Sequence, residues 1–467
     1  MLTRLKVRGF KNLVDLDVRF GPFTCIAGAN GVGKSNLFDA IQFLSALASD
    51  TLLEATKSVR DSRRPDVLSL FYHAGDSYAE TIFFEVEMVV PAEGEDDLGQ
   101  KAQASMTFLR YTLELGYRED DGNLEIHQES LVHINKGDAV KHLLFPHSVA
   151  WRNSVIQGRR TEPLISTVVN SVGETAIRLH QDGGGKGGGR PSPRIARTLP
   201  RTLLHLANAA EYRTAVLARN EMRSWALFQL EPTALREADD LKTPGYLTTK
   251  GGHLPATLYR LARRSEDQQV YDTVALRMSE LVQEIREIGV ERDDKRDLLT
   301  LWAASSDGTR HSAHALSDGT LRFLALATLE IDPDFQGVLC LEEPENGIHP
   351  ERIGTMLNLL QALAVDTSRP VDEDNPLRQV IINTHSPLVV LYTPGESLLA
   401  AEVVHVADRT RGLQLSLSCL PETWRTRGSK GGNLISKSKL LRYLRPEVSE
   451  DLAPNTVGQL AWVVDAR

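Results

Sequence analysis

The pattern of hydrophobic and polar positions predicts a core of short buried strands alternating with helices. Three short runs with apolar centres, at residues 23–27, 337–341 and 379–384, are typical of buried parallel strands. Helical periodicity follows the first run at residues 36–44 and precedes the second at residues 323–329. This alternation predicts an α/β fold whose central sheet is built from distant parts of the chain.

A second group of strand-like runs lies at residues 80–88, 108–117 and 124–134. The last two are separated by the polar sequence REDDGN, which is typical of a hairpin turn. We therefore expect an antiparallel β layer beside the central sheet.

Residues 136–300 are predicted to form an inserted, mainly helical lobe. Helical periodicity is clear at Arg197–Tyr212, Leu254–Arg264 and Val270–Ile288, and these helices are too short for coiled-coil arms. The apolar face of the third helix has two explanations, core packing or a partner surface. The glycine-rich segment 181–193 predicts a flexible, solvated loop.

Composition narrows the class of protein. The chain has 467 residues and a net charge of −9, which does not suggest an overall basic nucleic-acid binder. The three cysteines, Cys25, Cys340 and Cys419, lie far apart and predict no disulfide framework. No apolar run is long enough to span a membrane, and the first residues lack a signal-peptide pattern, so we expect a cytoplasmic location.

The candidate chemistry begins at residues 28–35, which read Gly-Ala-Asn-Gly-Val-Gly-Lys-Ser between a predicted strand and helix. This is the G-x-x-x-x-G-K-[ST] pattern of a phosphate-binding loop, whose backbone N–H groups surround a triphosphate at a helix N-terminus. Lys34 is expected to reach the β- and γ-phosphates, and Ser35 to bind Mg²⁺. A chance match on a glycine turn is the alternative, and the strand–loop–helix context disfavours it.

Two carboxylates directly follow the strand at residues 337–341. Parallel strands end at one edge of a sheet, so Glu342 and Glu343 are expected beside the phosphate loop. Glu342 is placed to hold Mg²⁺, and Glu343 to orient or deprotonate the attacking water. The alternative is an acidic loop after a core strand.

Two further candidates complete this set. Ser317 is placed to cap the helix at residues 323–329, and Gly319 keeps its N-terminal amides open to an anion. His385 ends the strand at residues 379–384 and is placed to contact a γ-phosphate. An ordinary N-cap and a structural histidine are the respective alternatives.

In this order the motifs resemble the ATPase heads of the ATP-binding-cassette (ABC) class within the AAA-type ATPases. The closest likeness is the branch with RecF, SMC and Rad50 heads and the OLD-family ATPases, on the sequences "LEEPENGIHP" and "INTHSP". The likeness covers about residues 1–90 and 300–395, and residues 2–20 look like the usual opening hairpin. The resemblance implies Mg²⁺ and ATP as cofactors and ATP hydrolysis as the reaction.

The resemblance also assigns roles to single residues. Residues 28–35 become the Walker A motif, 338–343 the Walker B, 345–349 the D-loop and His385 the switch histidine. The signature motif, Ser317–Thr320, closes in this family on the ATP of another subunit, which implies a homodimer of heads or a higher oligomer. The expected ATP-binding residues are Asn30, Gly31, Val32, Gly33, Lys34, Ser35 and Asn36, with Ser317, Asp318 and Gly319 in trans; Glu343, His385 and Lys34 are the expected catalytic residues, and Ser35 and Glu342 the metal ligands.

Three departures from the family pattern matter. The signature reads LSDGT where LSGGQ is more usual, and Glu342 replaces the common aspartate; both variants fit the OLD-like branch. The Q-loop glutamine has no clear position: Gln42 is too close to the phosphate loop, and Gln128 is a candidate. One Mg²⁺ contact therefore stays unassigned.

The expected domains are residues 1–135 and 301–395 as the two halves of the head, 136–300 as the inserted lobe and 396–467 as a C-terminal tail. No D-x-D pair of a TOPRIM nuclease occurs in residues 388–467, so we expect a stand-alone head. The resemblance favours a head that switches a separately encoded nuclease or TOPRIM-like effector in bacterial antiphage defence. The alternative is a RecF-like repair or chromosome-maintenance clamp that binds DNA directly.

The tail holds a basic segment at residues 425–445. Its basic residues are Arg425, Arg427, Lys430, Lys437, Lys439, Arg442 and Arg445, with no acidic residue among them. A solvated basic loop and a patch that contacts nucleic acid or an acidic partner are both consistent with this pattern.

Overall fold

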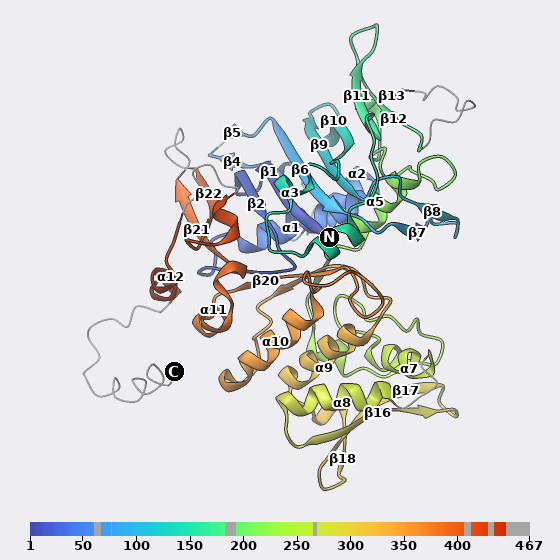
Figure 1. Ribbon diagram of the computed structural model, residues 1–467, viewed down its shortest axis with the longest axis vertical. Helices are drawn as coiled ribbons and strands as arrows, with labels where there is room; N and C mark the ends of the chain where they lie inside the picture. The colour runs from blue at the N-terminus through green and yellow to red at the C-terminus, as the bar shows by residue number, and fades with distance from the viewer. Residues whose placement is uncertain are drawn as a thin grey trace.

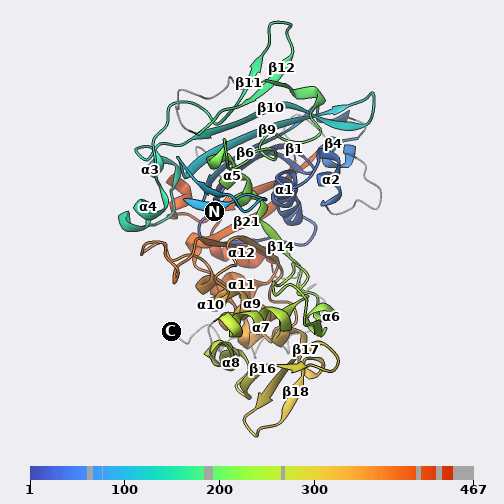
Figure 2. The same cartoon turned by 90° about the vertical axis from the view of Figure 1, so that its right-hand side faces the viewer.

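The computed structural model describes residues 1–59, 67–75, 77–182, 193–264, 269–405, 412–427 and 434–444 (Figure 1). An eight-stranded antiparallel sheet, a six-stranded mainly parallel sheet and a smaller four-stranded sheet account for most of the strands. The antiparallel sheet forms the upper part of the molecule in Figures 1 and 2, and the four-stranded sheet lies at the lower end.

The eight-stranded sheet confirms the predicted antiparallel layer. Its order is β13-β12-β11-β10-β9-β6-β1-β2. The bounds are β1 (Leu2–Phe10), β2 (Leu13–Arg19), β6 (Thr81–Val89), β9 (Phe108–Arg118), β10 (Asn123–His133), β11 (Ile165–Val169), β12 (Thr175–Leu179) and β13 (Arg194–Ile195). The hairpins β1–β2 and β9–β10 form as predicted.

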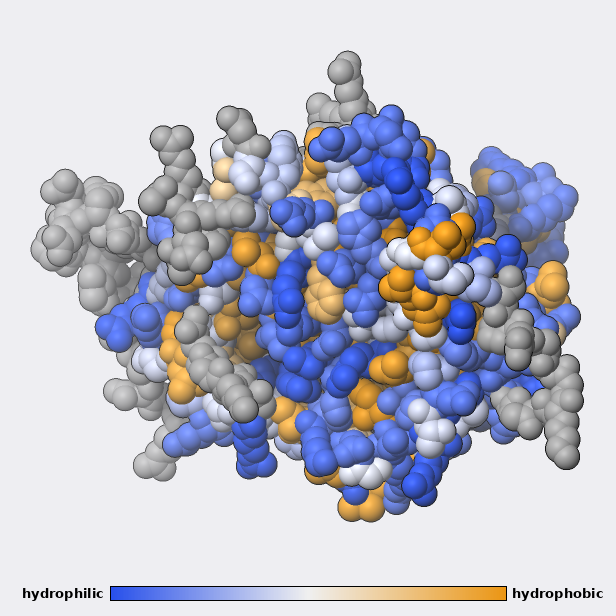
Figure 3. All heavy atoms as spheres, turned by 90° about the horizontal axis from the view of Figure 1, so that it is seen from above, coloured by the Kyte–Doolittle hydropathy of each residue, from blue (hydrophilic) through white to orange (hydrophobic). Residues whose placement is uncertain are grey.

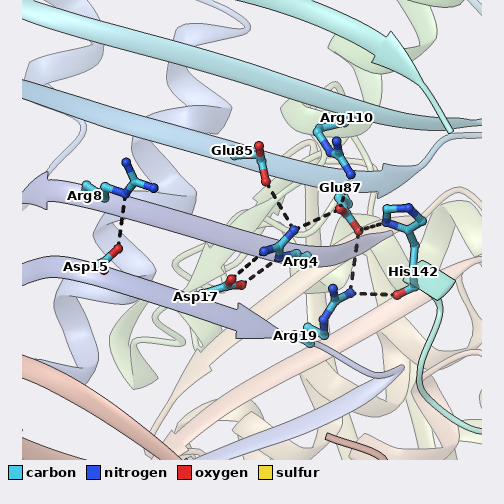
Figure 4. Close-up of polar contacts among 9 residues, drawn as sticks. All are labelled: Arg4, Arg8, Asp15, Asp17, Arg19, Glu85, Glu87, Arg110 and His142. Atoms are coloured by element: carbon cyan, nitrogen blue, oxygen red, sulfur yellow. Dashed lines mark hydrogen bonds and ion pairs between the residues drawn. The ribbon is translucent and has the colours of Figure 1, made fainter. Parts of the chain in front are cut away.

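One face of this sheet carries a network of charged side chains around Glu87 of β6 (Figure 4). The buried Glu87 carboxylate accepts hydrogen bonds from Arg110 (3.0 Å) and Arg4 (3.3 Å), and it lies 3.0 Å from His142 Nδ1 and 3.8 Å from Arg19. Burial opposes ionisation, but the hydrogen bond to His142 and the surrounding positive charges outweigh it and lower the pKa of Glu87 to about 2. The network joins four strands to helix α3 (Ala139–His142).

The other face of the sheet is apolar and packs on helix α1 (Lys34–Leu47). The rings of Phe10, Phe43 and Phe84 lie 5.6 to 6.0 Å apart, centroid to centroid. The upper end of the molecule is by contrast largely hydrophilic on its surface (Figure 3). The alternating apolar and polar positions of β6 and β9 thus reflect one buried and one polar face.

The six-stranded sheet positions the candidate site. Its order is β14-β19-β20-β3-β21-β22, and all pairs are parallel except β21–β22. The bounds are β14 (Ala226–Phe228), β19 (Gly337–Glu342), β20 (Arg378–Thr384), β3 (Phe23–Ala27), β21 (Leu398–His405) and β22 (Leu413–Cys419). The three apolar runs predicted as buried parallel strands are its central strands β19, β20 and β3.

Both faces of the parallel sheet are covered, which explains the continuous apolar runs. Ile26, Cys340 and Ile381 point into the core shared with α1 and the antiparallel sheet. Their neighbours Cys25 and Leu339 point into a second core, formed with α9 (Asp318–Ile331), α10 (Ile353–Leu363), α11 (Pro387–Tyr392) and α12 (Lys437–Leu444).

The predicted C-terminal tail is partly wrong. Strand β21 pairs with β3 and β22 pairs with β21, so residues 398–419 belong to the nucleotide-binding sheet. The first four residues of β21 are all buried because this part of the strand lies beside β3. Its last four residues are partly or fully exposed. The head therefore extends beyond residue 395.

The segment predicted as one helical lobe, residues 136–300, is divided among three parts of the fold. Strands β11 to β13 extend the antiparallel sheet, and β14 joins the parallel sheet. The remainder contributes α7 (Leu254–Arg264), α8 (Gln269–Leu281) and most of a small sheet of β15 (Asp239–Asp240), β16 (Ile285–Asp293) and β17 (Leu298–Ser305), to which β18 (Arg310–Ser312) adds from beyond residue 300. Helix α7 has the predicted bounds. The helix predicted at 197–212 does not form, and helix α5 (Arg213–Arg223) begins after that range.

The remaining elements are short. They are α2 (Leu52–Lys57), α4 (Val149–Val155), α6 (Pro232–Leu235), β4 (His73–Ala74), β5 (Ser77–Tyr78), β7 (Glu93–Glu95) and β8 (Lys101–Gln103). Nearly all of the glycine-rich segment 181–193 lies outside the described residues. Within the part of the chain that the structure describes, no helix is both long and apolar enough to cross a membrane.

Candidate functional site

The phosphate loop connects β3 to α1 with the geometry of an anion site. Gly33 precedes the helix with φ 97°, and Gly31 has φ 79°, so both backbones lie in the region that favours glycine. No side chain caps the N-terminus of α1, which leaves its first N–H groups available to a ligand. The predicted strand, loop and helix are all present in this order.

Lys34 is held inside the loop. Its ammonium donates hydrogen bonds to the carbonyl oxygens of Gly28 (2.6 Å) and Ala29 (2.7 Å). Burial lowers the pKa of Lys34, and the nearby carboxylates of Glu343, Glu342 and Glu345 partly oppose that effect. The Lys34 ammonium is thus a positioned cation that can bind a phosphate group.

The turn between β1 and β2 supports the loop through two residues that the sequence analysis did not identify. Asn12 donates from Nδ2 to the Val32 carbonyl (3.2 Å) and accepts from Asn36 Nδ2 (2.8 Å). Lys11, whose φ is 45°, pairs with Asp39 of α1 at 2.8 Å. A methyl group on Gly33 would lie 2.0 Å from Asn12 Nδ2, so the turn and the loop are packed in direct contact.

Glu342 and Glu343 lie at the C-terminal edge of β19, as predicted from the strand pattern. Asn383, on the neighbouring strand β20, donates from Nδ2 to Glu342 Oε1 (3.2 Å). The backbone N–H of Glu343 donates to the carbonyl oxygen of Asn383 (3.0 Å). Glu343 has φ 46°, which is uncommon for a residue with a side chain and is often found at functional sites.

The Glu343 carboxylate contacts His385, which the structure brings to it from the end of β20. The Oε1 atom lies 2.7 Å from His385 Nδ1, and Oε2 accepts a hydrogen bond from Asn346 (2.9 Å). Partial burial opposes ionisation, but these two hydrogen bonds and the charges of His385 and Lys34 outweigh it and lower the pKa of Glu343. Glu343 is therefore an ionised, oriented carboxylate.

A third carboxyl group, that of Glu345, lies close to Glu343 and His385. Glu345 is buried, and its Oε1 accepts a hydrogen bond from Thr384, the residue before His385. Burial raises the pKa of Glu345, although the Thr384 hydrogen bond lowers it in part. Glu345 and Glu343 thus have opposite pKa shifts within one short turn.

A cavity of about 730 Å³ lies between the phosphate loop and these carboxylates. Of the predicted residues, it is lined by Asn30, Gly31, Gly33, Lys34, Ser35, Asn36, Glu342 and Glu343. The structure adds Gln229, directly after β14, and Arg322 of α9. Arg322 donates to the carbonyl oxygens of Leu230 and Asn346, so it joins the segments on both sides of the cavity.

Two glutamines bear on the unassigned Q-loop position. The candidate Gln128 lies on β10 of the antiparallel sheet, away from the cavity, whereas Gln229 lines it. Gln229 was not predicted from the sequence because β14, the strand before it, has only three residues and shows no recognisable hydrophobic period.

The predicted signature residues lie outside this cavity. Ser317 caps α9 as predicted, and its side chain accepts a hydrogen bond from the Thr320 N–H (3.2 Å). Ser317 and Gly319 line a separate cavity of about 290 Å³. Asp318 pairs with Arg236 at 2.7 Å. A methyl group on Gly319 would lie 2.3 Å from the Gly347 carbonyl oxygen, so the signature and the D-loop are in contact.

The residues present fit a Mg²⁺–nucleotide complex. The glycine loop leaves open space at Gly31, and the carbonyl oxygens of Gly28 and Ala29 orient the Lys34 ammonium. In the described part of the chain, no group of three His, Cys, Asp or Glu side chains could hold a metal ion by itself. Mg²⁺ is commonly held by few protein ligands together with substrate phosphates, so Ser35, Glu342 and Gln229 would hold it with the nucleotide.

The basic segment does not form one continuous patch. Arg425 is buried and donates to the carbonyl oxygens of Arg19 and Glu396 and to Thr24 Oγ1. Lys437 donates to two carbonyl oxygens at the end of α11. Lys439 and Arg442 are exposed, whereas Lys430 and Arg445 lie outside the described residues.

The fold and the site together define a P-loop nucleotide-binding domain. Residues 1–144 match the family described as "RecF/RecN/SMC N terminal domain". Residues 198–391 match the family described as "AAA domain, putative AbiEii toxin, Type IV TA system". The two matches include β3, β14, β19 and β20 of the parallel sheet.

Single proteins show the same likeness over shorter lengths. The chain is 33% identical to the DNA replication and repair protein RecF of Bacteroides thetaiotaomicron over 84 residues, which is 18% of this chain and 23% of RecF. It is 30% identical to the OLD nuclease of Thermus scotoductus over 105 residues, 21% of this chain and 19% of that protein. A solved Smc head bound to the C-winged helix domain of ScpA is 14% identical, with 90% and 98% of the two chains covered and a TM-score of 0.46.

The chain accordingly contains a P-loop head that is similar to the ABC-class heads of RecF-, SMC- and OLD-like proteins. The matched segments span less than a quarter of the RecF and OLD relatives.

Proposed function

We propose that this chain binds Mg²⁺–ATP at residues 28–35 and hydrolyses it with Glu343 as the general base. The observation that carries the proposal is the Glu343–His385 contact of 2.7 Å at the edge of the cavity that contains the phosphate loop. An ionised carboxylate with a fixed orientation can accept the proton of an attacking water.

The residues at the cavity have separate proposed roles in phosphoryl transfer. Lys34 and the loop N–H groups neutralise the phosphate charge, and Ser35 and Glu342 hold Mg²⁺. Mg²⁺ supplies charge stabilisation at the β- and γ-phosphates when it is bound. His385 contacts Glu343 and orients it, although His385 is not among the residues that line the cavity.

Two heads are proposed to close on ATP. Ser317, Asp318 and Gly319 do not line the cavity of their own chain, and Ser317 and Gly319 line a second cavity instead. A signature motif that contacts ATP must then come from another subunit. ATP binding would be the switch and hydrolysis the reset, because ATP binds better to the closed pair.

The biological role proposed for this switch is the control of a separately encoded nuclease or TOPRIM-like effector in bacterial antiphage defence. Two findings support it: the match of residues 198–391 to a family described with the AbiEii toxin, and the likeness to an OLD nuclease. The alternative is a RecF-like repair clamp that binds DNA, and the likeness to RecF supports it equally.

The first test is ATP turnover and nucleotide binding by the purified chain. We expect Mg²⁺-dependent phosphate release, and Lys34→Ala should bind ATP poorly because the phosphate charge loses its main cation. Release of phosphate at the parental rate by Lys34→Ala would contradict the proposed site.

The second test separates the two biological roles. A nuclease-like reading frame beside this gene, and phage resistance that requires both genes, would support defence. Neighbouring replication genes, and ATP-dependent binding of DNA ends or gaps by the purified chain, would support the repair clamp.

A further inference from the structure

Helix α12, the last described element, contacts both halves of the nucleotide site. It packs against α11, and Leu440 and Leu444 are buried in the core beneath the parallel sheet (Figures 1 and 2). Sequence analysis treated this region only as part of a basic tail.

The first contact is with the helix that follows His385. The Lys437 ammonium donates to the carbonyl oxygens of Leu391 (3.1 Å) and Thr393 (2.9 Å) at the C-terminus of α11. A cation there satisfies carbonyl groups that have no partner within the helix and interacts favourably with the helix dipole. Helix α11 has six residues and begins two residues after His385.

A helix this short has little stability of its own, so its position depends on tertiary contacts. Val389 and Val390 of α11 are buried, and Lys437 donates a hydrogen bond to the carbonyl oxygen at the C-terminal end of this helix. Because His385 lies two residues before α11 and contacts Glu343, a displacement of α11 would change the orientation of that pair.

Tyr443, on the same helix, lies beside the phosphate loop. Burial raises the pKa of Tyr443, and a hydrogen bond with the main chain of Ala29 partly lowers it. The carbonyl oxygen of Ala29 accepts the Lys34 ammonium at 2.7 Å.

We propose that α12 is a coupling element of the ATPase site, in which Lys437 positions His385 through α11. Movement of α12 then changes ATP turnover without any α12 side chain contacting the nucleotide. This inference rests on the proposed ATPase function.

The test compares Lys437→Met with Lys439→Met as the control. Lys439 lies on the same helix, is exposed and carries the same charge, but it makes no such contact with α11 through its side chain in the described structure. We expect Lys437→Met to lower kcat about tenfold with ATP affinity nearly unchanged, since it removes charge-assisted hydrogen bonds to the C-terminal end of α11. Lys439→Met should match the parent.

Amide hydrogen exchange gives a readout that does not need hydrolysis. Residues 387–393 should exchange faster in Lys437→Met than in Lys439→Met. Equal exchange, kcat and affinity in these two variants would overturn the proposal. A parent that binds ATP without turnover would refute the proposed hydrolysis, while the exchange comparison would still decide the role of α12. Lys437→Gln is a smaller change at the same position, so it keeps the test decisive if Lys437→Met does not fold.

Discussion

At the scale of single residues, two buried glutamates of the antiparallel sheet show how partners decide ionisation. Glu87 is surrounded by arginines and His142, and its pKa is about 2, so its contribution to stability is present above the unfolded pKa and is lost as the pH falls toward 2. Glu129 accepts hydrogen bonds from the Leu203 and Leu204 N–H groups and from Tyr111, and burial raises its pKa to about 7.

The Glu129 shift predicts a pH dependence of opposite sign. Between about pH 4.3, where an unfolded glutamate titrates, and about pH 7, the folded state binds a proton that the unfolded state has lost. The free energy of unfolding should therefore fall across this range as pH rises. Urea unfolding between pH 5 and 8 checks this, and Glu129→Gln should flatten the slope even if it lowers overall stability. A slope identical to that of the parent would show that Glu129 does not titrate there.

Asn12 offers a second prediction at this scale. Asn12→Ala removes two hydrogen bonds to the phosphate loop and α1, each worth about 0.5–1.5 kcal/mol, so ATP affinity should fall about tenfold. Asp15→Asn is the control on the same hairpin, because the Asp15–Arg8 pair is exposed and contributes little. Fluorescent-nucleotide titration measures both, and equal affinities would remove Asn12 from the site.

At the scale of elements, the sequence predicted the strands that are buried or clearly alternating. It predicted β3, β19, β20 and the β9–β10 hairpin, because their apolar positions follow one period over their whole length. The sequence analysis predicted a helix that ends at Ile288, whereas in the structure α8 ends at Leu281 and β16 begins at Ile285. The pairing of β16 with β17 shifts register between Ile285 and Glu287, so the buried Ile285 and Ile288 have a helix-like spacing.

Part of the site could be predicted for the same reason. The phosphate loop, Glu342, Glu343 and His385 all follow buried strands, so sheet topology alone brings them together. Asn12, Gln229 and Arg322 could not be found this way, since they reach the site from a turn, a three-residue strand and a helix face. Their roles depend on tertiary packing that no local pattern records.

The prediction that the basic segment contacts nucleic acid or an acidic partner now concerns helix α12. Lys439 and Arg442 are its exposed cations, whereas Lys437 caps α11. The double variant Lys439→Glu with Arg442→Glu should weaken association with nucleic acid or an acidic partner and flatten its salt dependence, with basal ATPase activity unchanged. An unchanged salt slope in a binding titration would leave these residues as a solvated surface.

At the scale of the whole molecule, the account requires two chains for a complete site. Ser317→Arg should bind ATP in each head and yet fail to join the opposing one, because added bulk and charge fall on the surface that meets the other head's ATP. Light scattering with and without Mg²⁺–ATP, together with nucleotide titration, checks both parts. ATP-dependent association of Ser317→Arg at the parental level would place the signature contact elsewhere.

The most direct test of the central claim is phosphate release by Glu343→Gln. The amide keeps the shape of the side chain but cannot accept the proton of water, and loss of a general base typically costs on the order of 10²–10⁴ in rate. The account predicts that this variant binds ATP, releases phosphate at least about a hundredfold more slowly and accumulates as closed pairs, detected by cross-linking near residue 317. Hydrolysis at the parental rate would contradict the assignment of Glu343 and the mechanism built on it.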